Sequence, residues 1–265
     1  MTPIIKKWHP RWIVDDLITM IERNLIHYAR LPQLIVFSSI QPVMFLLLFT
    51  YVFGGAIKGT AGNYIDYLLP GILVQTVVFG AIQTGVGLSE DLSKGLIDRF
   101  KSLPMSQSAV LGGRTAADML RNVFVILLML GVGYLIGFRL HGGFFNLVTA
   151  FALLLYFGFA FSWISATIGM LVRNTETAQV AGFIWVFPLV FASSIFVPLE
   201  TMPEPLRTFA TYNPITITVS AVRGLMQGGS SATNLGLHVV EAFGAVLLIL
   251  IVFMPLAIRL YRRNE

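Results

Sequence analysis

Residues that could do acid, base, nucleophilic or metal chemistry are few and scattered in this chain of 265 residues. The chain has no cysteine, and its four histidines have no spacing at which two would ligate one metal; they are His9, His27, His141 and His238. No G-x-S-x-G element and no obvious carboxylate pair is present. The segment 54–60, GGAIKGT, lacks the spacing of an ATP-binding phosphate loop. The sequence therefore predicts that this chain is not an enzyme, binds no metal or cofactor, and cannot hydrolyse ATP alone.

The elements that carry these residues are strongly apolar. Hydrophobic residues make up 56% of the chain and charged residues only 12%, which excludes a soluble globular protein. A helix needs about 20 apolar residues to cross a bilayer. Suitable segments lie at about 34–56, 65–89, 119–138, 146–172, 178–198 and 235–258. We therefore expect an all-α membrane protein with six transmembrane helices.

The distribution of basic residues predicts the orientation of these helices. Six crossings place both termini on the same side of the membrane. If that side is the cytoplasm, it holds all but four of the 18 Lys and Arg residues, the exceptions being Lys58, Arg139, Arg207 and Arg223. This bias predicts an N-in, C-in topology. It also accounts for the net charge of +5 without a nucleic-acid partner.

Residues 1–33 are expected to form a cytoplasmic region, and residues 34–265 the transmembrane domain. Apolar residues recur at helical spacing on one face of the first region, at Ile13, Leu17, Ile21, Leu25 and Tyr28. This pattern predicts an amphipathic helix that lies in the cytoplasmic headgroup layer. The alternative is an ordinary amphipathic helix packed against the rest of the protein.

The connection at about 90–118 predicts a short cytosolic helix. Its apolar stripe is formed by Leu92, Leu96, Phe100 and Leu103. Glu90 and Asp91 are expected to begin this helix, and Pro104 to end it.

A second long connection, at about 198–234, predicts a re-entrant segment on the outer side. It contains Pro198, Pro203, Pro205 and Pro214 and an apolar stretch, PITITVSAVRGLM, that is too short to cross a membrane. We expect this stretch to dip into the membrane while it stays buried against protein, so that its backbone polar groups remain paired.

Three motifs in the chain together resemble a known family. The first is an E-x-x-x-G-x-[LI]-[DE]-R-x-[KR]-x-x-P pattern, matched by Gly95, Leu96, Asp98, Arg99, Lys101 and Pro104, with Asp91 in place of Glu. The second is the run NTETAQ at 174–179. The third comprises F-x-P-x-x-x-M-P, N-P-x-T and R-x-L-x-x-G elements between Phe196 and Gly228. In this order, on a six-span background, they resemble the permease subunit of an ABC-2 type exporter of the daunorubicin-resistance and nodulation-exporter kind.

The resemblance implies function and partners. Such a permease is a homodimer in a bacterial inner membrane, in contact with membrane lipids, and each copy binds one of two cytosolic ATPase subunits. ATP and Mg are then bound by the partner subunit. The substrate expected is an amphipathic drug-like, lipid-linked or glycan-like molecule that moves outward. The alternative is an ion-gradient-driven secondary transporter or channel, although no convincing internal repeat is present.

The cytosolic motif supplies the candidate residues for coupling to the ATPase. We expect Leu96 and Phe100 to enter an apolar groove on the ATPase while charged residues contact its rim. The full candidate set is Asp91, Gly95, Leu96, Asp98, Arg99, Phe100, Lys101 and Pro104, with Arg173 and Glu176 as a weaker second contact. The alternative is that this helix lies on the inner leaflet without a partner.

Other candidates lie along the translocation path. The outer gate or re-entrant segment is assigned to Pro198, Met202, Pro203, Asn213, Pro214 and Arg223. Glu241 is expected to meet a cationic substrate or, alternatively, to pair with His238 or an outer arginine. Gln75, with Gln41 and Gln83, serves either helix packing or the substrate path. Close helix packing is expected at Gly80, Gly85, Gly87, Gly158 and Gly169.

Overall fold

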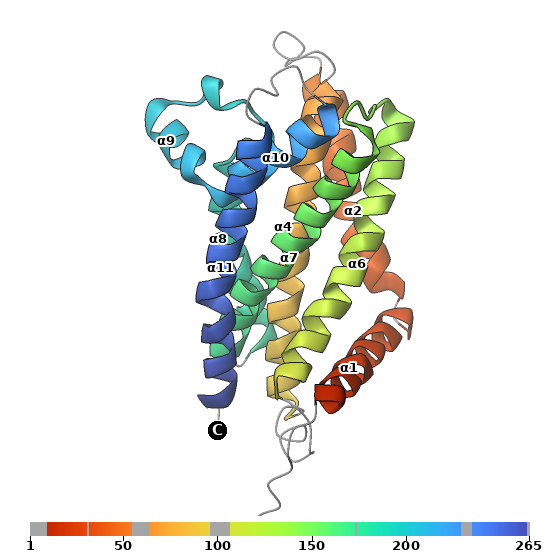
Figure 1. Cartoon of the computed structure of the whole chain (residues 1–265), viewed down its shortest axis with the longest axis vertical. Coiled ribbons are helices and arrows are strands. Elements are labelled where there is room, and N and C mark those ends of the chain that lie inside the picture. The colour runs from red at the N-terminus through yellow and green to blue at the C-terminus, as the bar shows by residue number, and fades with distance from the viewer. Residues whose placement is uncertain are drawn as a thin grey trace, which may run out of the picture.

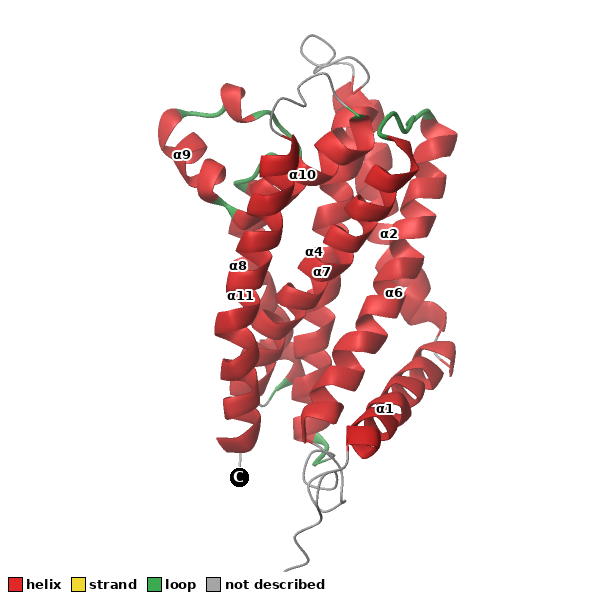
Figure 2. Cartoon of the chain, viewed as in Figure 1, coloured by secondary structure: helices red, strands yellow, loops and turns green. Residues whose placement is uncertain are grey.

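The computed structural model describes residues 10–30, 32–54, 64–95, 107–172, 174–228 and 235–263. This described part is helical and contains no strand (Figure 2). The helices are α1 (Pro10–Arg30), α2 (Pro32–Leu48), η1 (Phe49–Phe53), α4 (Tyr64–Ser93), α6 (Gln107–Ile136), α7 (Gly143–Leu171), α8 (Thr175–Phe191), η2 (Leu199–Thr201), α9 (Glu204–Tyr212), α10 (Pro214–Gln227) and α11 (Leu235–Arg263). The predicted all-α fold is confirmed.

The long helices stand side by side in a bundle, with α4 and α7 in its middle (Figure 1). Helix α1 and the last turns of α11 lie at the lower end of the bundle, here called the α1 end. Helices α9 and α10 lie at the opposite end, called the α10 end. Both ends of the described chain therefore lie at the same end of the bundle.

Four helices in the described part are long and apolar enough to cross a membrane: α4, α6, α7 and α11. Helices α2 and α8 are apolar as well but have 17 residues each, and the π-helix η1 directly continues α2. All six predicted apolar segments thus contain helices. Because α4 is apolar around its whole circumference, it lies at the centre of the bundle, with Leu68, Ile72 and Leu73 fully buried.

Glycines allow α4 and α7 to pack closely. A side chain added at Gly85 would collide with the backbone oxygen of Ser165, and one added at Gly169 would collide with the backbone oxygen of Gly85. Gly158 of α7 likewise leaves room for Val77 of α4. The predicted role of these glycines in close helix packing is confirmed.

The predicted amphipathic helix near the N-terminus is present as α1. Its residue Met20 is buried and packs against Gly113 of α6. Ile18 and Ile26 are exposed elsewhere on the same helix. Helix α1 is therefore packed along one side onto the bundle, and its exposed apolar side chains remain available to a membrane surface.

Two predicted boundaries are wrong. Glu90 and Asp91 do not begin a new helix but belong to the last turns of α4, which continues to Ser93. The helix ends there because Gly95 adopts a left-handed conformation, with φ of 65°, that favours glycine after a helix. Helix α6 begins at Gln107 rather than near 119, so Arg114 and Arg121 are helical residues rather than parts of an inner loop.

Candidate functional site

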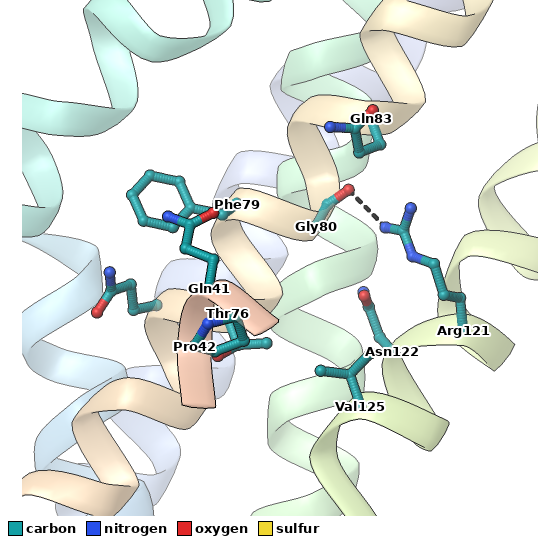
Figure 3. Close-up of a pocket in the computed structure, with 10 residues that line it drawn as sticks. Gln41, Pro42, Thr76, Phe79, Gly80, Gln83, Arg121, Asn122 and Val125 are labelled. Carbon is teal, nitrogen blue, oxygen red and sulfur yellow. Dashed lines mark hydrogen bonds between the residues drawn. The ribbon is translucent and has the colours of Figure 1, made fainter. Parts of the chain in front are cut away.

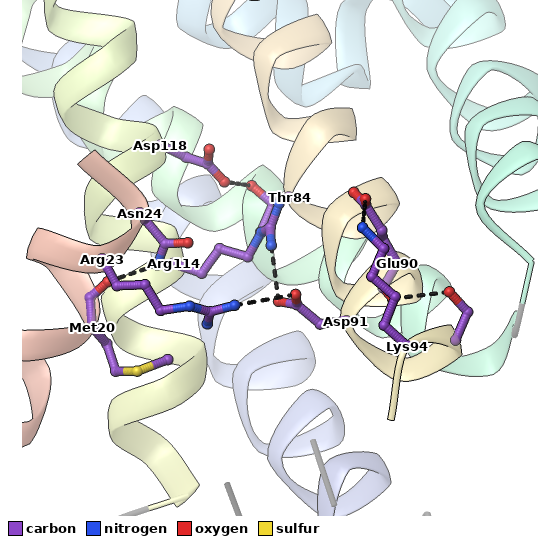
Figure 4. Close-up of polar contacts among 10 residues, drawn as sticks. Met20, Arg23, Asn24, Thr84, Glu90, Asp91, Lys94, Arg114 and Asp118 are labelled. Carbon is purple, nitrogen blue, oxygen red and sulfur yellow. Dashed lines mark hydrogen bonds and ion pairs between the residues drawn. The ribbon is translucent and has the colours of Figure 1, made fainter. Parts of the chain in front are cut away.

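Asp91 joins three helices at the α1 end of the bundle. Its Oδ2 accepts a hydrogen bond of 3.0 Å from Nη1 of Arg114 in α6, and its Oδ1 lies 3.6 Å from Nη2 of Arg23 in α1 (Figure 4). The Asp91 and Arg114 side chains are only 13% and 19% exposed. We call these three residues the Asp91 cluster. Because both arginines hold one carboxylate, the end of α4 is fixed relative to α1 and α6.

The same end of α4 carries further contacts beside the predicted coupling segment. Ser89 donates a hydrogen bond of 2.7 Å to the backbone oxygen of Val172, just after α7. Lys94 forms an exposed ion pair with Glu90 (Figure 4). The hydrogen bond and charge of Glu90 raise the pKa of Lys94 above its ordinary value.

Only part of the predicted coupling set can be placed. Asp91 and Gly95 lie at the end of α4, and Glu176 is exposed in the first turn of α8. Asn174 caps that helix, because its Oδ1 accepts a hydrogen bond of 2.8 Å from the backbone N–H of Glu176. The remaining candidates lie outside the described residues: Leu96, Asp98, Arg99, Phe100, Lys101, Pro104 and Arg173.

A charged pair lies inside the bundle, where the sequence analysis had placed an inner loop. Arg121 Nη1 lies 3.9 Å from Oδ1 of Asp118, and both side chains are almost fully buried. Arg121 also donates a hydrogen bond of 2.8 Å to the backbone oxygen of Gly80 in α4. Thr84 donates to Asp118, and Ser162 Oγ lies 3.2 Å from the Thr84 hydroxyl oxygen. Arg121 lies about 21 Å along α6 from Gln107 by helical rise, which is deep within the bundle.

A cavity of about 70 Å³ lies beside this pair, between α2, α4 and α6 (Figure 3). We call it the carboxamide cavity because four of its lining residues are amides, namely Gln41, Gln75, Gln83 and Asn122. None of these four side chains makes a hydrogen bond within the described part of the chain, and the Oε1 atom of Gln75 is fully buried. The other lining residues are Pro42, Thr76, Phe79, Gly80, Arg121 and Val125.

A row of phenylalanines begins at this cavity. Phe79, which lines the cavity, contacts Phe183 and Phe187 of α8, with ring centroids 6.0 and 5.7 Å away. Phe183, Phe187 and Phe191 lie on one face of α8 because they are spaced four residues apart. We call the whole row the phenylalanine ladder. Successive ring centroids along it lie 4.5 to 6.0 Å apart, and it comprises Phe79, Phe183, Phe187, Phe191, Phe196, Phe49 and Phe45.

Asn213 organises the α10 end of the bundle. Its Oδ1 accepts a hydrogen bond from the backbone N–H of Ile215, which caps α10, while Pro214 occupies the first helical position. Its Nδ2 donates to the backbone oxygens of Leu189 and Ala192 at the end of α8. One buried side chain therefore satisfies polar groups at two helix ends. Asn213 and Pro214, two of the residues assigned to the outer gate or re-entrant segment, thus lie at the junction of α9 and α10.

Arg223 of α10 ties this region to α4. Its Nε donates a hydrogen bond of 3.1 Å to the backbone oxygen of Tyr67, and its Nη2 donates one of 3.0 Å to that of Ser194. The guanidinium carbon lies 3.6 Å from the centroid of the Tyr67 ring. The Tyr67 hydroxyl donates a hydrogen bond of 2.9 Å to the same backbone oxygen of Ser194. Arg223 is thus a partly buried residue of α10 that holds the backbone of α4 and the segment after α8 together.

The other predicted outer residues lie in the connection between α8 and α10. Pro198 precedes η2, Met202 follows it, and Pro203 precedes α9. Met202 is half-buried, and Pro203 is exposed. These residues shape the turns of the connection, and they make no contact with the carboxamide cavity.

Glu241 and Gln75, the two candidates for the substrate path, have different surroundings. Glu241 is about half exposed on α11, and its Oε2 lies 3.4 Å from Nδ1 of His238, the partner considered as an alternative. Gln75 is 3% exposed and lines the carboxamide cavity. The structure therefore brings Gln75 together with Gln41 and Gln83, and it leaves Glu241 outside that cavity.

Sequence reasoning missed Asp118, Arg121 and Asn122 as residues of the bundle interior. A signal was available, because Asp118 and Arg121 have the i, i+3 spacing of a helical ion pair and directly precede an apolar run. The charges were instead interpreted as the end of an inner loop.

Comparison with known proteins agrees with these features. The profile of the ABC-2 type transporter family matches residues 15–226. The chain is 37% identical over 252 residues to the daunorubicin resistance ABC transporter permease protein of Streptomyces coeruleorubidus, covering 95% of this chain and 88% of that protein. It is 24% identical over 220 residues to a probable doxorubicin resistance ABC transporter permease protein of Mycobacterium tuberculosis, covering 83% and 79% of the two chains. It is 26% identical over 261 residues to a putative transport permease of Cyanophora paradoxa, covering 95% and 89%. The chain therefore belongs to the ABC-2 type transporter family, as a membrane permease subunit rather than an ATPase.

Proposed function

We propose that this permease moves an amphipathic, drug-like, lipid-linked or glycan-like molecule outward across the cytoplasmic membrane of a bacterium. Its family implies an ABC ATPase as partner, and we propose that two ATPase subunits serve a homodimer of this chain. The relatives named for daunorubicin and doxorubicin resistance favour a drug-like substrate.

The exposure of two glutamines on the apolar helices α2 and α4 carries this proposal. Gln41 of α2 and Gln83 of α4 are both exposed and line the mouth of the carboxamide cavity. An amide that faces hydrocarbon without a partner is costly. The surface that carries Gln41 and Gln83 is therefore better covered by water or by a second copy of the chain than by lipid. A substrate path between two subunits places both glutamines in such surroundings.

The phenylalanine ladder supports an amphipathic substrate. It leads from Phe79 at the cavity to Phe49 and Phe45 near the end of α2, in the direction of the α10 end. Phe187 and Phe191 are 43% and 46% exposed. Exposed rings of this kind stack well on a planar apolar molecule. The ladder thus offers successive contacts along the outward direction.

The proposed topology has six spans, with α1 and the end of α11 in the cytoplasm. The placement of α1 and the end of α11 at one end of the bundle supports this arrangement. Helix α10 is proposed to be the re-entrant segment. Its buried residues Ile215, Val219 and Val222 face protein, and Asn213 pairs the neighbouring backbone groups.

The ATPase is proposed to dock on the segment 91–104, with Arg173 and Glu176 as a second contact. The Asp91 cluster supports this role because it fixes the point at which the segment leaves α4. The variant Phe100→Asp tests the docking. It is expected to abolish co-purification of the ATPase, because a charge would enter an apolar groove, while the permease still inserts. Unchanged co-purification would contradict the docking proposal.

Export itself is tested in proteoliposomes that contain the chain and its ATPase. Doxorubicin is expected to move away from the side that binds ATP, and only when ATP is supplied. An ATPase variant that binds but does not hydrolyse ATP is the control. Transport by the permease alone, or transport that collapses with the proton gradient but not with loss of ATP, would instead favour an ion-driven transporter.

A further inference from the structure

The carboxamide cavity has hydrogen-bonding capacity that the described part of the chain does not use. Gln41, Gln75, Gln83 and Asn122 make no hydrogen bond there, and the buried Oε1 of Gln75 has no partner. Buried polar groups in proteins are almost always paired. Two of these amides are buried, Gln75 and Asn122, and two are exposed at the same cavity, Gln41 and Gln83. The unpaired buried amides beside a space of about 70 Å³ therefore indicate that a polar occupant completes them.

The chemistry of the lining favours an uncharged occupant. Each amide offers both donors and an acceptor, which complements a hydroxyl group because a hydroxyl also donates and accepts. Arg121 is the only charged residue that lines the cavity within the described part of the chain, and Asp118 lies beside it at 3.9 Å. The guanidinium of Arg121 also donates a hydrogen bond to the backbone oxygen of Gly80 (Figure 3). Because Asp118 offsets the charge of Arg121, a charged occupant would enter a site without net charge, at high cost.

Phe79 connects this polar site with an apolar one. It lines the cavity and is also the first ring of the phenylalanine ladder. A molecule with its polar group between the amides could therefore place an aromatic body against Phe79 and Phe187. This combination selects for an amphipathic ligand with a planar apolar part.

We propose that the carboxamide cavity is a binding subsite for an uncharged, hydroxyl-bearing group of the transported molecule, whose aromatic body stacks on Phe79. The inference rests on the proposed export function and specifies the substrate class. The subsite lies within one subunit, between α2, α4 and α6, and opens where Gln41 and Gln83 are exposed.

The test uses the full chain in lipid nanodiscs without nucleotide, and a matched pair of neutral fluorescent probes. One probe is a naphthalimide that carries a 2,3-dihydroxypropyl group, and the other is its di-O-methyl analogue. Binding is measured from probe fluorescence and corrected with empty nanodiscs. The diol is expected to bind at least about tenfold more tightly than the methylated probe, because methylation removes its hydrogen-bond donors.

The double variant with Gln75→Met and Gln83→Met should weaken diol binding about tenfold or more and leave the methylated probe unchanged. Gln179→Met is the control, because Gln179 is exposed on α8 and does not line the cavity. Gel filtration of each variant reports on folding. The wild-type probe comparison does not depend on any variant, so it decides the matter even if the double variant fails to fold.

Equal binding of the two probes by the wild type, binding of neither probe, or equal weakening of both by the double variant would overturn the subsite. These outcomes are separate from failure of the export function. A complex that exports doxorubicin with ATP but does not discriminate between the probes would retain the proposed function and lose only the subsite. A chain that binds the diol more tightly than the methylated probe but whose complex does not export doxorubicin with ATP would retain the subsite and lose the proposed function.

Discussion

Arg114 Nη1 donates a hydrogen bond of 3.0 Å to Oδ2 of Asp91, across 23 residues of sequence that include the predicted coupling segment. The pair joins the end of α4 to α6, so the segment between them begins and ends on linked helices. A force applied to that segment by an ATPase would therefore reach α4 and α6 together. We therefore expect Asp91 to act as a positioning residue if the segment contacts the ATPase as proposed.

The variant Asp91→Asn should weaken coupling more than it weakens assembly. Loss of the carboxylate charge leaves two arginines without their shared partner, which is expected to cost about 1–2 kcal/mol of unfolding free energy. Transport per ATP hydrolysed should fall, while ATPase co-purification persists. The exposed pair of Glu90 and Lys94 provides the control, because Glu90→Gln should change stability by no more than about 0.5 kcal/mol. Equal effects of both variants on transport per ATP would contradict a special role for Asp91.

The variant Gly85→Ala should destabilise the helix bundle strongly. The added methyl would collide with the backbone oxygen of Ser165, so α4 and α7 would have to separate. We expect a loss of about 1–3 kcal/mol, measured as a lower Tm in detergent. Gly131→Ala is the matched control, because nothing lies within 4 Å of the position its methyl would occupy. A Tm that falls equally for both would show that the close packing is not what Gly85 provides.

The variant Arg223→Lys should loosen the α10 end even though it keeps the charge. A lysine cannot donate to the backbone oxygens of Tyr67 and Ser194 at once, and it stacks less well on the Tyr67 ring. We expect faster hydrogen exchange in residues 193–228 than in the wild type. Arg207→Lys, at an exposed position in α9, is the control. Unchanged exchange in Arg223→Lys would mean that shape and charge alone hold this region.

The variant Glu241→Gln distinguishes a substrate contact from a structural pair. If Glu241 meets cationic substrates, its neutralisation should lower export of the cationic drug doxorubicin and spare a neutral compound. If its contact with His238 is what matters, His238→Ala should reproduce the effect, and both compounds should be affected equally. Initial export rates of the two compounds in the same vesicles provide the comparison.

Local features of the fold could be predicted because they depend on neighbours in sequence. Apolar runs predicted the helices. The start of α10 is equally local, because the Asn213 cap and Pro214 at the first helical position act within one turn. The end of α4 was misplaced for the opposite reason. Acidic residues favour a helix start, but no residue before Gly95 breaks the helix, so α4 continues past Asp91.

The sequence by itself determined the class of the protein: an all-helical membrane permease whose motifs resemble the ABC-2 family. Composition and periodicity suffice for the helical membrane fold, because a bilayer admits only long apolar helices or closed barrels. The permease role came from the resemblance of the three motifs. Tertiary structure decided which polar groups meet. The ion pair of Asp91 with Arg114, the buried Arg121 and the cavity with Gln75 all depend on contacts between helices far apart in sequence. Spacing along one helix carries no information on which neighbour faces it, so only the packed bundle could bring these side chains together.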